Sequence, residues 1–106
     1  MLNKFTIQKD RSIKDSMIKI NRNSIATLFV LNKKKLVGAV TDGDIRRALI
    51  RHLSMDVLVT ELMNVNPSVA DVVDSKESIH RIMSESNIAR VPIVDAKGKI
   101  CKIFRY

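Results

Sequence analysis

A hydroxyl and a carboxylate lie three residues apart, at Thr41 and Asp44, between an apolar stretch and a helix-like pattern. Side chains at this spacing can both reach one sugar diol, with Asp44 accepting hydrogen bonds from the hydroxyls and Thr41 donating or accepting nearby. The N-terminus of the following helix attracts phosphate, and Arg46 and Arg47 in its first turn add donors suited to phosphate oxygens. Gly38, in the preceding strand, leaves the backbone open to close approach. The pattern indicates a site for a nucleotide or a sugar phosphate, and the expected ligand-binding residues in this stretch are Gly38, Thr41, Asp42, Asp44, Arg46 and Arg47.

The same residues also have a purely structural explanation. Thr41 or Asp42 can cap the helix, as such residues commonly do at helix starts. Gly43 can simply allow the turn, and the two arginines can point into solvent. Asp42 and Asp44 superficially resemble a calcium loop, but the spaced oxygen ligands and the terminal glutamate of a twelve-residue loop are missing. The residues by themselves leave the capping and the ligand-binding explanations open.

These residues must be positioned by elements that the sequence contains twice. In the first copy, Ile13, Met17 and Ile20 recur at helical spacing. The predicted elements of this copy are a helix near residues 12–22 capped by Ser12 or Asp10, a hairpin with strands over 26–31 and 36–40, and a second helix that begins at Asp42-Gly43-Asp44 and has Ile45, Leu49 and Leu53 on its apolar face.

The second copy repeats this order but ends before its last helix. Its predicted elements are a short helical turn over 57–63, a boundary at Pro67, a helix that starts near Ser75 and has Ile79, Ile82 and Met83 on its core face, and strands over 89–94 and 99–104. The helical motif that starts at Lys14 returns at Lys76, 62 residues later, whereas Ile25 returns at Ile88, 63 residues later. The two offsets predict a one-residue insertion between the helix and the strand.

The fold class predicted from this repetition is α+β, with two β-α-β-β-α repeats related by pseudo-twofold symmetry and the second truncated at its C-terminal helix. The first repeat is expected over residues 1–56 and the second over 57–106, and together they form one module. Two half-sized units, each unable to bury both faces of its small sheet, are expected to pack against one another. Their interface then forms a natural cleft.

Three stretches carry a resemblance to a known family. The stretch from Gly38 to Arg47 resembles the G-h-h-T-x-x-D segment of cystathionine β-synthase (CBS) domains, that from Asn87 to Asp95 is similar to the family's I-x-x-h-P-V-V-D strand, and the linker from Leu58 to Pro67 resembles its V-x-D-h-M-N-x-N-P stretch. The resemblance implies a tandem CBS pair, or Bateman module, which senses AMP, ADP, ATP or a related nucleotide or nucleotide sugar in the inter-repeat cleft. The wording T-D-G-D-I-R-R is especially similar to CBS pairs attached to sugar-phosphate isomerases and sugar nucleotidyltransferases.

This resemblance implies a regulatory role with one competent ligand site. At an offset of 63, Cys101 corresponds to Gly38 and Phe104 to Thr41, while the counterpart of Asp44 would lie beyond the chain. The second diol motif is therefore expected to be absent. The second repeat is expected to contribute the base pocket, through the backbone groups and side chains of Arg90, Val91, Pro92 and Ile93. For Val91 and Ile93 the alternative is core packing, because alternation along a strand buries every second residue.

The composition limits the other functions. Apolar residues make up 45% and aromatic residues 4% of the chain, so the core must consist of Ile, Val, Leu and Met. No apolar stretch approaches the roughly 20 residues needed to cross a bilayer, and the start lacks a secretory signal, so a cytoplasmic location with no membrane partner is expected. Cys101 is expected to be a small buried apolar residue, and with His52 and His80 it offers no metal-ligand spacing.

The expected partners follow from charge and from what the motifs lack. A net charge of +8 favours an anionic partner, but no aromatic stacking platform or reading helix supports nucleic acid. No nucleophile has a plausible His partner and no P-loop occurs, so no catalysis and no required cofactor are expected. We expect the chain to form a homodimer. We also expect it to be part of a longer chain with a catalytic domain downstream of Tyr106. The alternative function is a dimerisation scaffold without a ligand.

Overall fold

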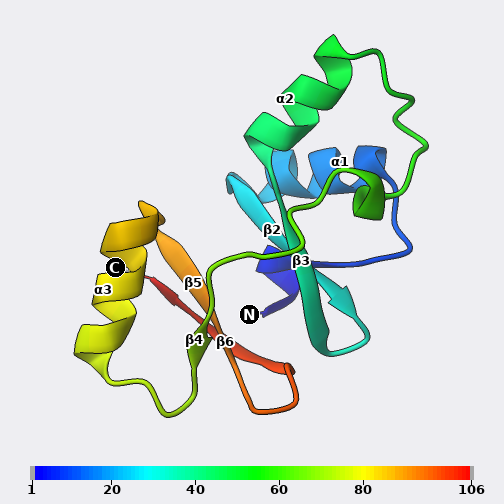
Figure 1. The fold of residues 1–106 in the computed structure, drawn as a ribbon. Coiled ribbons are helices and arrows are strands. Elements are labelled where there is room, and N and C mark those ends of the chain that lie inside the picture. Colours follow the sequence, from blue (N-terminus) through cyan, green and yellow to red (C-terminus); the bar gives the residue numbers. More distant parts are fainter. Residues whose placement is uncertain (1, 106) are drawn as a thin grey trace.

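The fold consists of two three-stranded sheets, each accompanied by helices (Figure 1). The computed structural model describes residues 2–105. The first repeat contains β1 (Thr6–Gln8), α1 (Ile13–Asn23), β2 (Thr27–Asn32), β3 (Lys35–Thr41) and α2 (Asp42–Ile50), and the second contains β4 (Ala70–Asp71), α3 (Lys76–Ser86), β5 (Arg90–Val94) and β6 (Ile100–Arg105). Short 3-10 helices cover Leu2–Phe5 and Val59–Glu61. The predicted α+β class with two related repeats is confirmed.

Each sheet has the same topology. The first strand of a repeat lies parallel to the second, and the second pairs with the third in an antiparallel hairpin, in the orders β1-β2-β3 and β4-β5-β6. A helix forms the crossover between the two parallel strands, as parallel pairing requires. In the first repeat α2 follows the hairpin and packs with α1, whereas among the described residues of the second repeat α3 is the only α-helix.

The crossover helices begin and end in the same way. Ser12 caps α1 by accepting a hydrogen bond from the Asp15 amide at 3.1 Å, and Ser75 caps α3 with the same 3.1 Å contact to the Ser78 amide. Each helix ends at a residue in the left-handed region with φ of 53°, Ser24 in α1 and Asn87 in α3. Polar caps of this kind satisfy backbone groups that the helix leaves unpaired.

These caps correct the predicted position of the insertion. Ser12 matches Ser75 and Ser24 matches Asn87, so the offset is 63 through the helix and no insertion separates the helix from the strand. The extra residue lies in the second hairpin instead. Gly38 pairs with Val30, and the matching pair in the second repeat is Lys102 with Ile93.

The returning strand therefore has an offset of 64, and two predicted correspondences were wrong by one residue. The counterpart of Gly38 is Lys102 rather than Cys101. The counterpart of Thr41 is Arg105 rather than Phe104, because Thr41 pairs with Thr27 as Arg105 pairs with Arg90. The second repeat still lacks the diol motif under the corrected alignment, because Lys102 does not reproduce the glycine of the first repeat and Arg105 does not reproduce its hydroxyl.

The two repeats join at their hairpins around a pseudo-twofold axis. Lys35 forms an antiparallel β-bridge with Lys99. Lys99 is the residue that corresponds to Lys35 in the second repeat, at an offset of 64. On either side, the Leu36 amide donates to the Gly98 carbonyl and the Ile100 amide donates to the Lys34 carbonyl, both at 3.0 Å. These two bonds are equivalent under the exchange of the repeats. The axis therefore passes between Lys35 and Lys99.

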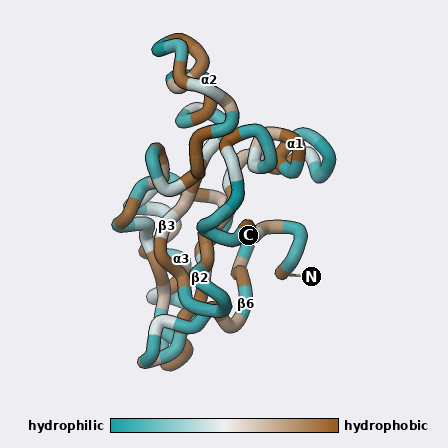
Figure 2. Tube along the Cα trace, turned by 90° about the vertical axis from the view of Figure 1, so that its right-hand side faces the viewer, coloured by the Kyte–Doolittle hydropathy of each residue, from teal (hydrophilic) through white to brown (hydrophobic). Residues whose placement is uncertain are grey.

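Separate cores stabilise the two repeats, and a third apolar cluster joins them. The buried residues of the first core include Leu28, Val30 and Val40, those of the second are Ala70, Ile79, Met83, Val91 and Ile93, and those of the joining cluster are Phe29, Leu31, Ala39 and Ile100. Figure 2 shows hydrophobic residues along β2 and β3 and hydrophilic residues at the hairpin turns. The core contains few aromatic rings, as the composition predicted.

Two predicted core residues lie at the surface. The buried face of α2 consists of Ile45 and Ala48. Leu49, in the last turn of the helix, lies on the solvent side and is 48% exposed. Cys101 is exposed rather than buried. It lies where the pairing of β5 with β6 skips a residue, and this irregularity turns it out of the ladder.

Gly38 is required by the chain's own linker. The linker crosses β3, where the Ala39 amide donates to the Asn64 carbonyl at 2.9 Å and the Asn64 amide donates back at 2.8 Å. A Cβ atom on Gly38 would lie 2.6 Å from Met63 Sδ and 2.9 Å from the Asn64 carbonyl oxygen. The close approach expected at this glycine is therefore made by the linker.

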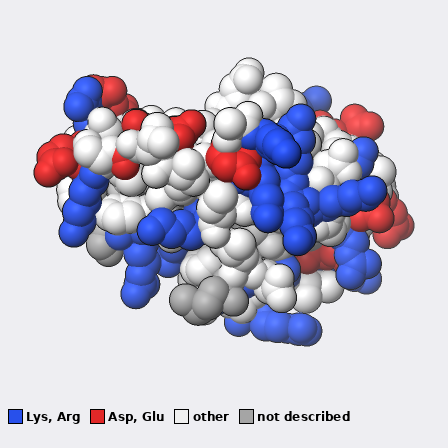
Figure 3. Space-filling view, turned by 90° about the horizontal axis from the view of Figure 1, so that it is seen from below, with Lys and Arg blue, Asp and Glu red and all other residues white. Residues whose placement is uncertain are grey.

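Charge is unevenly distributed over the surface. Basic side chains gather on the face shown in Figure 3, and acidic ones lie mostly along its upper margin and at its right-hand end. Within the described part of the chain, no helix has the length and apolar character to cross a membrane.

Replacing Gly38 by Ala should lower the free energy of unfolding by about 1–3 kcal/mol, because the added methyl group overlaps Met63 and the Asn64 carbonyl. Gly43→Ala is the matched control. Its Cβ would make ordinary contacts with the end of the Arg47 side chain at 3.4 Å and with Thr41 Oγ1 at 3.6 Å, and Ala is the better helix former. Urea denaturation measures both variants. Equal stability of Gly38→Ala and the wild type would mean that the linker shifts freely.

Candidate functional site

Thr41 and Asp44 cap α2 reciprocally. The Asp44 amide donates to Thr41 Oγ1 at 3.1 Å, and the Thr41 amide donates to Asp44 Oδ2 at 2.9 Å. Arg47 Nη2 then donates to Asp44 Oδ1 at 2.6 Å, and Arg46 pairs with Asp42 at 3.4 Å on the exposed side of the helix. The capping explanation is confirmed. The hydroxyl proton of Thr41 and the remaining lone pairs of the Asp44 carboxylate are still available to a ligand.

A cleft of about 480 Å³ opens between the two repeats. Its walls come from β2, β3, the linker and the junction of α3 with β5. The lining residues are Ala26, Thr27, Phe29, Ala39, Thr41, Asn64, Asn66, Pro67, Ser68, Ser86, Asn87, Ile88, Ala89 and Arg90. The cleft brings together Thr41 of the first repeat and Arg90 of the second, as expected for a shared groove.

The Arg90 side chain, which lines the cleft, also has a buried donor without a partner. Its Nε atom is buried and, within residues 2–105, has no hydrogen-bond partner. Its guanidinium carbon lies 4.9 Å from the centroid of the Phe5 ring, a cation–π contact that holds the group in place. A buried donor without a partner costs about 1–3 kcal/mol relative to a satisfied one.

The other predicted site residues lie outside the cleft lining. Val91 and Ile93 are 0% and 3% exposed and belong to the core of the second repeat, and Pro92 is also fully buried. The core-packing alternative therefore describes these side chains, and a contribution of this stretch to a base pocket stays a prediction. Alternation alone did not show which side of β5 faces the other repeat.

Asp44 and Arg47 line a different cavity. This second space, of about 620 Å³, lies beside α2 and is also lined by Arg51, Glu61 and Met63. Asp44 is half-buried, with a side-chain exposure of 21%, whereas the Arg47 side chain is 68% exposed. Thr41 at the start of α2 therefore faces the inter-repeat cleft. The Asp44 carboxylate, which caps α2 together with Thr41, faces the other cavity, next to the 3-10 helix Val59–Glu61.

Several polar lining residues were missed by sequence reasoning. Ser68 and Ser86 share a hydrogen bond at 2.9 Å between their hydroxyls, and the Asn66 amide donates to Asn64 Oδ1 at 3.0 Å. Asn87 is the left-handed cap of α3. The sequence signal that could have pointed to these lining residues was the polar stretch around Pro67. From the sequence, this stretch was interpreted only as the boundary between the two repeats. Among the described residues no group of three or more His, Cys, Asp or Glu side chains could hold a metal ion.

Two β-α-β-β units that face one another across a shared cleft define a tandem-repeat module. The family model for the CBS domain matches residues 1–51 and 59–105, which covers both units. The chain therefore belongs to the CBS domain family, and it contains a pair of these domains. The resemblance detected in the linker, in β5 and around Thr41 is confirmed.

Relatives among known proteins contain this module as a small part. The arabinose 5-phosphate isomerase GutQ of Escherichia coli O6:H1 is 32% identical over 94 residues, which cover 84% of this chain and 28% of the isomerase. The inosine-5'-monophosphate dehydrogenase of Nitrosopumilus maritimus is 30% identical over 99 residues, which cover 92% of this chain and 20% of the dehydrogenase. The chain thus spans less than a third of the length of either relative.

Solved CBS domain structures share the fold. A CBS domain protein of Pyrobaculum aerophilum, solved in complex with AMP, superposes with a TM-score of 0.81 at 20% identity, over 94% of this chain and 78% of that one. The CBS domain pair of protein MJ0100, solved with 5'-methylthioadenosine and S-adenosyl-L-methionine, gives a TM-score of 0.78 at 26% identity, over 95% of this chain and 83% of that one.

Thr41→Ala should lower the free energy of unfolding by about 1 kcal/mol, because it removes the hydroxyl that caps α2. Thr41→Ser should recover most of this loss. A double-mutant cycle with Asp44→Ala should give a coupling of about 0.5 kcal/mol or more, because each side chain bonds the other's amide.

The control is the corresponding cycle in α3, between Ser75 and Ser78. There only the Ser75 side chain caps its partner's amide, so thermal and urea unfolding should give a coupling near zero. Equal couplings in the two helices would contradict the reciprocal cap.

Proposed function

We propose that this CBS pair is a regulatory module that binds one adenine nucleotide, or a related adenosine derivative, in the cleft between its repeats. The observation that carries the proposal is the cleft itself, which Thr41 of the first repeat and Arg90 of the second repeat line together. MJ0100, which has the higher sequence identity of the two solved structures described above, was crystallised with two adenosine-containing ligands. CBS domains are regulatory rather than catalytic.

The lining of the cleft suits such a ligand in two zones. Phe29, Ala39 and Ile88 provide apolar surface against which a purine ring can pack, with a gain of roughly 25 cal/mol per Å² of apolar area buried. The Thr41 hydroxyl and the Arg90 guanidinium provide polar contacts at the wall. A pocket of about 480 Å³ lies in the range that holds a small cofactor or nucleotide.

Only one such site is proposed for the chain. In the second repeat the position of Thr41 is held by Arg105 and that of Gly38 by Lys102. A long basic side chain at the Thr41 position removes the hydroxyl. The pseudo-symmetric site therefore lacks the groups that make the first one suitable for a ribose.

Regulation would follow from the position of the cleft. Because both repeats line it, a bound ligand contacts both and favours the relative arrangement in which these contacts are best. An attached domain whose activity depends on that arrangement then responds to the ligand through the coupling free energy. A cytoplasmic location, where adenine nucleotides are at hand, is part of this proposal.

The attached domain is proposed to be a sugar-phosphate isomerase. The support is the likeness to arabinose 5-phosphate isomerase, in which the matched region makes up 28% of the chain. The second candidate is a sugar nucleotidyltransferase, the other enzyme expected from the sequence. The relatives described above do not support it. A homodimer is also proposed.

A second candidate function is a dimerisation scaffold without a ligand. The observation that favours it is the apolar end of α2, where Leu49 is 48% and Ile50 is 71% exposed. Exposed apolar side chains on one helix often mark a protein interface. The two functions differ in their requirement for Thr41 and Arg90, which a scaffold does not need.

Calorimetric titration with AMP, and in parallel with 5'-methylthioadenosine, should give one site per chain. Arg90→Gln should raise the Kd by about tenfold or more, because a positively charged side chain is lost from the cleft wall, and Thr41→Val should raise it several-fold. Arg81→Gln on the exposed side of α3 is the charge-matched control and should leave the Kd unchanged.

Sedimentation equilibrium of the same variants separates the two functions. An unchanged oligomeric state together with lost binding supports the nucleotide module. Absence of binding by the wild-type chain to either compound, with a stable dimer that Ile50→Asp dissociates, would favour the scaffold. Two equivalent sites per chain would contradict the single-site proposal.

A further inference from the structure

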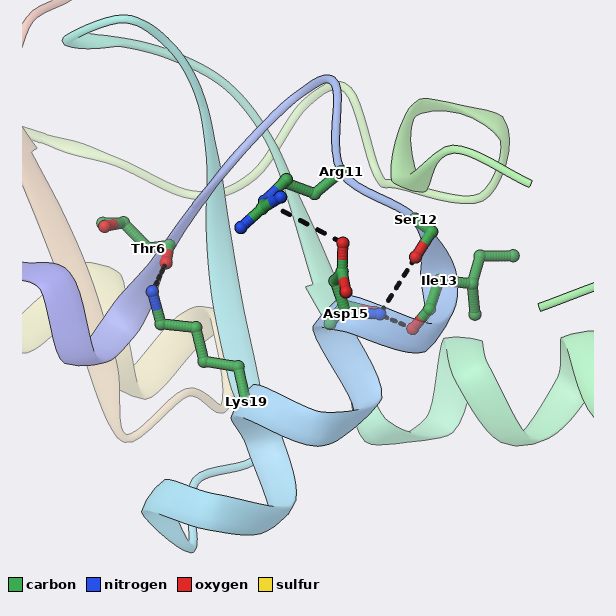
Figure 4. A network of polar contacts seen from close by, with 7 residues as sticks. Thr6, Arg11, Ser12, Ile13, Asp15 and Lys19 are labelled. Carbon is green, nitrogen blue, oxygen red and sulfur yellow. Dashed lines mark hydrogen bonds and ion pairs between the residues drawn. The ribbon is translucent and has the colours of Figure 1, made fainter. Parts of the chain in front are cut away.

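A third cavity lies away from both the inter-repeat cleft and the space beside α2, between β1 and α1. Its volume is about 460 Å³, and its lining residues are Asn3, Thr6, Ile7, Gln8, Arg11, Asp15, Ile18, Lys19, Arg22 and Asn23. Figure 4 shows Lys19 extending from α1 to the backbone of β1, with the Arg11 side chain lying in the same space. We call this cavity the α1 pocket.

Three cations and a single carboxylate line the α1 pocket. Lys19 Nζ donates to the Thr6 carbonyl at 2.6 Å, which fixes the ammonium group at the edge strand. Arg11 lies 3.9 Å from Asp15, at the outer limit of an ion pair, with both side chains well exposed. Arg22 makes no ion pair among the described residues. The positive charge of the pocket is therefore largely uncompensated.

The environment of Lys19 reflects this excess of positive charge. Partial burial, and secondarily the nearby Arg11 cation, lower the pKa of Lys19 below the usual lysine value. Both causes disfavour the charged ammonium group. An anion in the pocket would oppose them by pairing with the ammonium and guanidinium groups together.

The second repeat shows that the fold does not need these cations. At the constant offset of 63, Arg11 corresponds to Asp74, Lys19 to Ile82 and Arg22 to Glu85. The same parallel strands and crossover helix therefore form with two acids and an apolar residue in these places. The basic cluster is a property of the first repeat alone, and stability of the unit does not account for it.

We propose that the α1 pocket is a phosphate site, which binds the phosphate group of a small phosphomonoester. Arg11 and Arg22 offer planar forked donors and Lys19 a point charge, and together these groups suit the oxygens of a dianionic phosphate. The Asn3 and Asn23 side chains at the same wall can bond hydroxyl groups on the rest of the molecule. The site is independent of the nucleotide proposed for the cleft.

The shape of the pocket favours a small molecule over a polymer. A concave space of about 460 Å³ suits a ligand of metabolite size, whereas a phosphate backbone needs an extended basic track. Gln8 is not available as part of a longer track, because both ends of its amide are bonded to the backbone of Lys33.

The first test maps the site on the wild-type chain by NMR. Glycerol 3-phosphate and inorganic phosphate are titrated separately into the 15N-labelled protein in chloride buffer at low ionic strength. We expect saturable amide shifts at Arg11, Lys19 and Arg22, with smaller ones at Thr41 and Arg90. Shifts spread evenly over all exposed lysines and arginines would overturn the proposal.

The second test uses variants of equal charge. Lys19→Gln combined with Arg22→Gln should raise the Kd for glycerol 3-phosphate by about tenfold or more, since two charged donors are lost. Lys14→Gln combined with Lys97→Gln removes the same charge from exposed positions outside the pocket and should change the Kd less than about twofold, by long-range screening alone. Equal losses in the two pairs would overturn the proposal.

Two further measurements separate the possible sources of the signal. Arg22→Gln alone disrupts no hydrogen bond or ion pair described above, so it provides a weaker-binding variant even if loss of Lys19 disturbs folding. Vesicles with phosphatidic acid should not bind in a pocket-dependent way, and if they bind while glycerol 3-phosphate does not, the small-molecule site is refuted. Retention of phosphate binding in Arg90→Gln distinguishes this site from the cleft.

Discussion

The reciprocal backbone pairing of the two hairpins is the constraint on which the cleft depends. Lys35 and Lys99 bridge at the axis, and the flanking bonds from Leu36 and Ile100 repeat one another under the exchange of the repeats. Backbone groups in such a junction must be satisfied wherever they are buried, so the two sheets cannot slide without losing both bonds together. The joining apolar cluster excludes water from this region. Thr41 and Arg90 face the same space because their hairpins are held in this register.

A second constraint acts at the start of α2, where one set of atoms serves two purposes. Thr41 and Asp44 satisfy each other's amides in the cap, which fixes their rotamers before any ligand arrives. Side chains fixed in this way lose little conformational entropy on binding. The cap and the proposed ligand contact are therefore compatible, and the arrangement favours Thr41 as the group that contacts ligand, since Asp44 is also bonded to Arg47.

The sequence allowed the fold to be predicted further than the site. Periodicity and caps were sufficient for α1, α3 and both hairpins, because these signals are local. The short strands β1 and β4, of three and two residues, are too brief for alternation to be recognised and form only because β2 and β5 offer a partner edge. Side-chain direction at Val91 and Ile93 depended on which sheet face meets the other repeat, which is a tertiary property. Arg90 was found through family resemblance, whereas its unpartnered Nε could emerge only from packing.

Divergence between the repeats separates what the fold requires from what a ligand requires. Positions that build the unit keep their character, as in the caps Ser12 and Ser75 and the buried pair Ile20 and Met83. Positions that face the cavities do not, since Thr41 corresponds to Arg105. Arg22 corresponds to Glu85 in an otherwise equivalent crossover helix, so the charge at this position is not what the backbone needs. Polar and charged side chains that occur in only one repeat, both in the cleft and along α1, are therefore the ones that selection for ligand binding, rather than for stability, would explain.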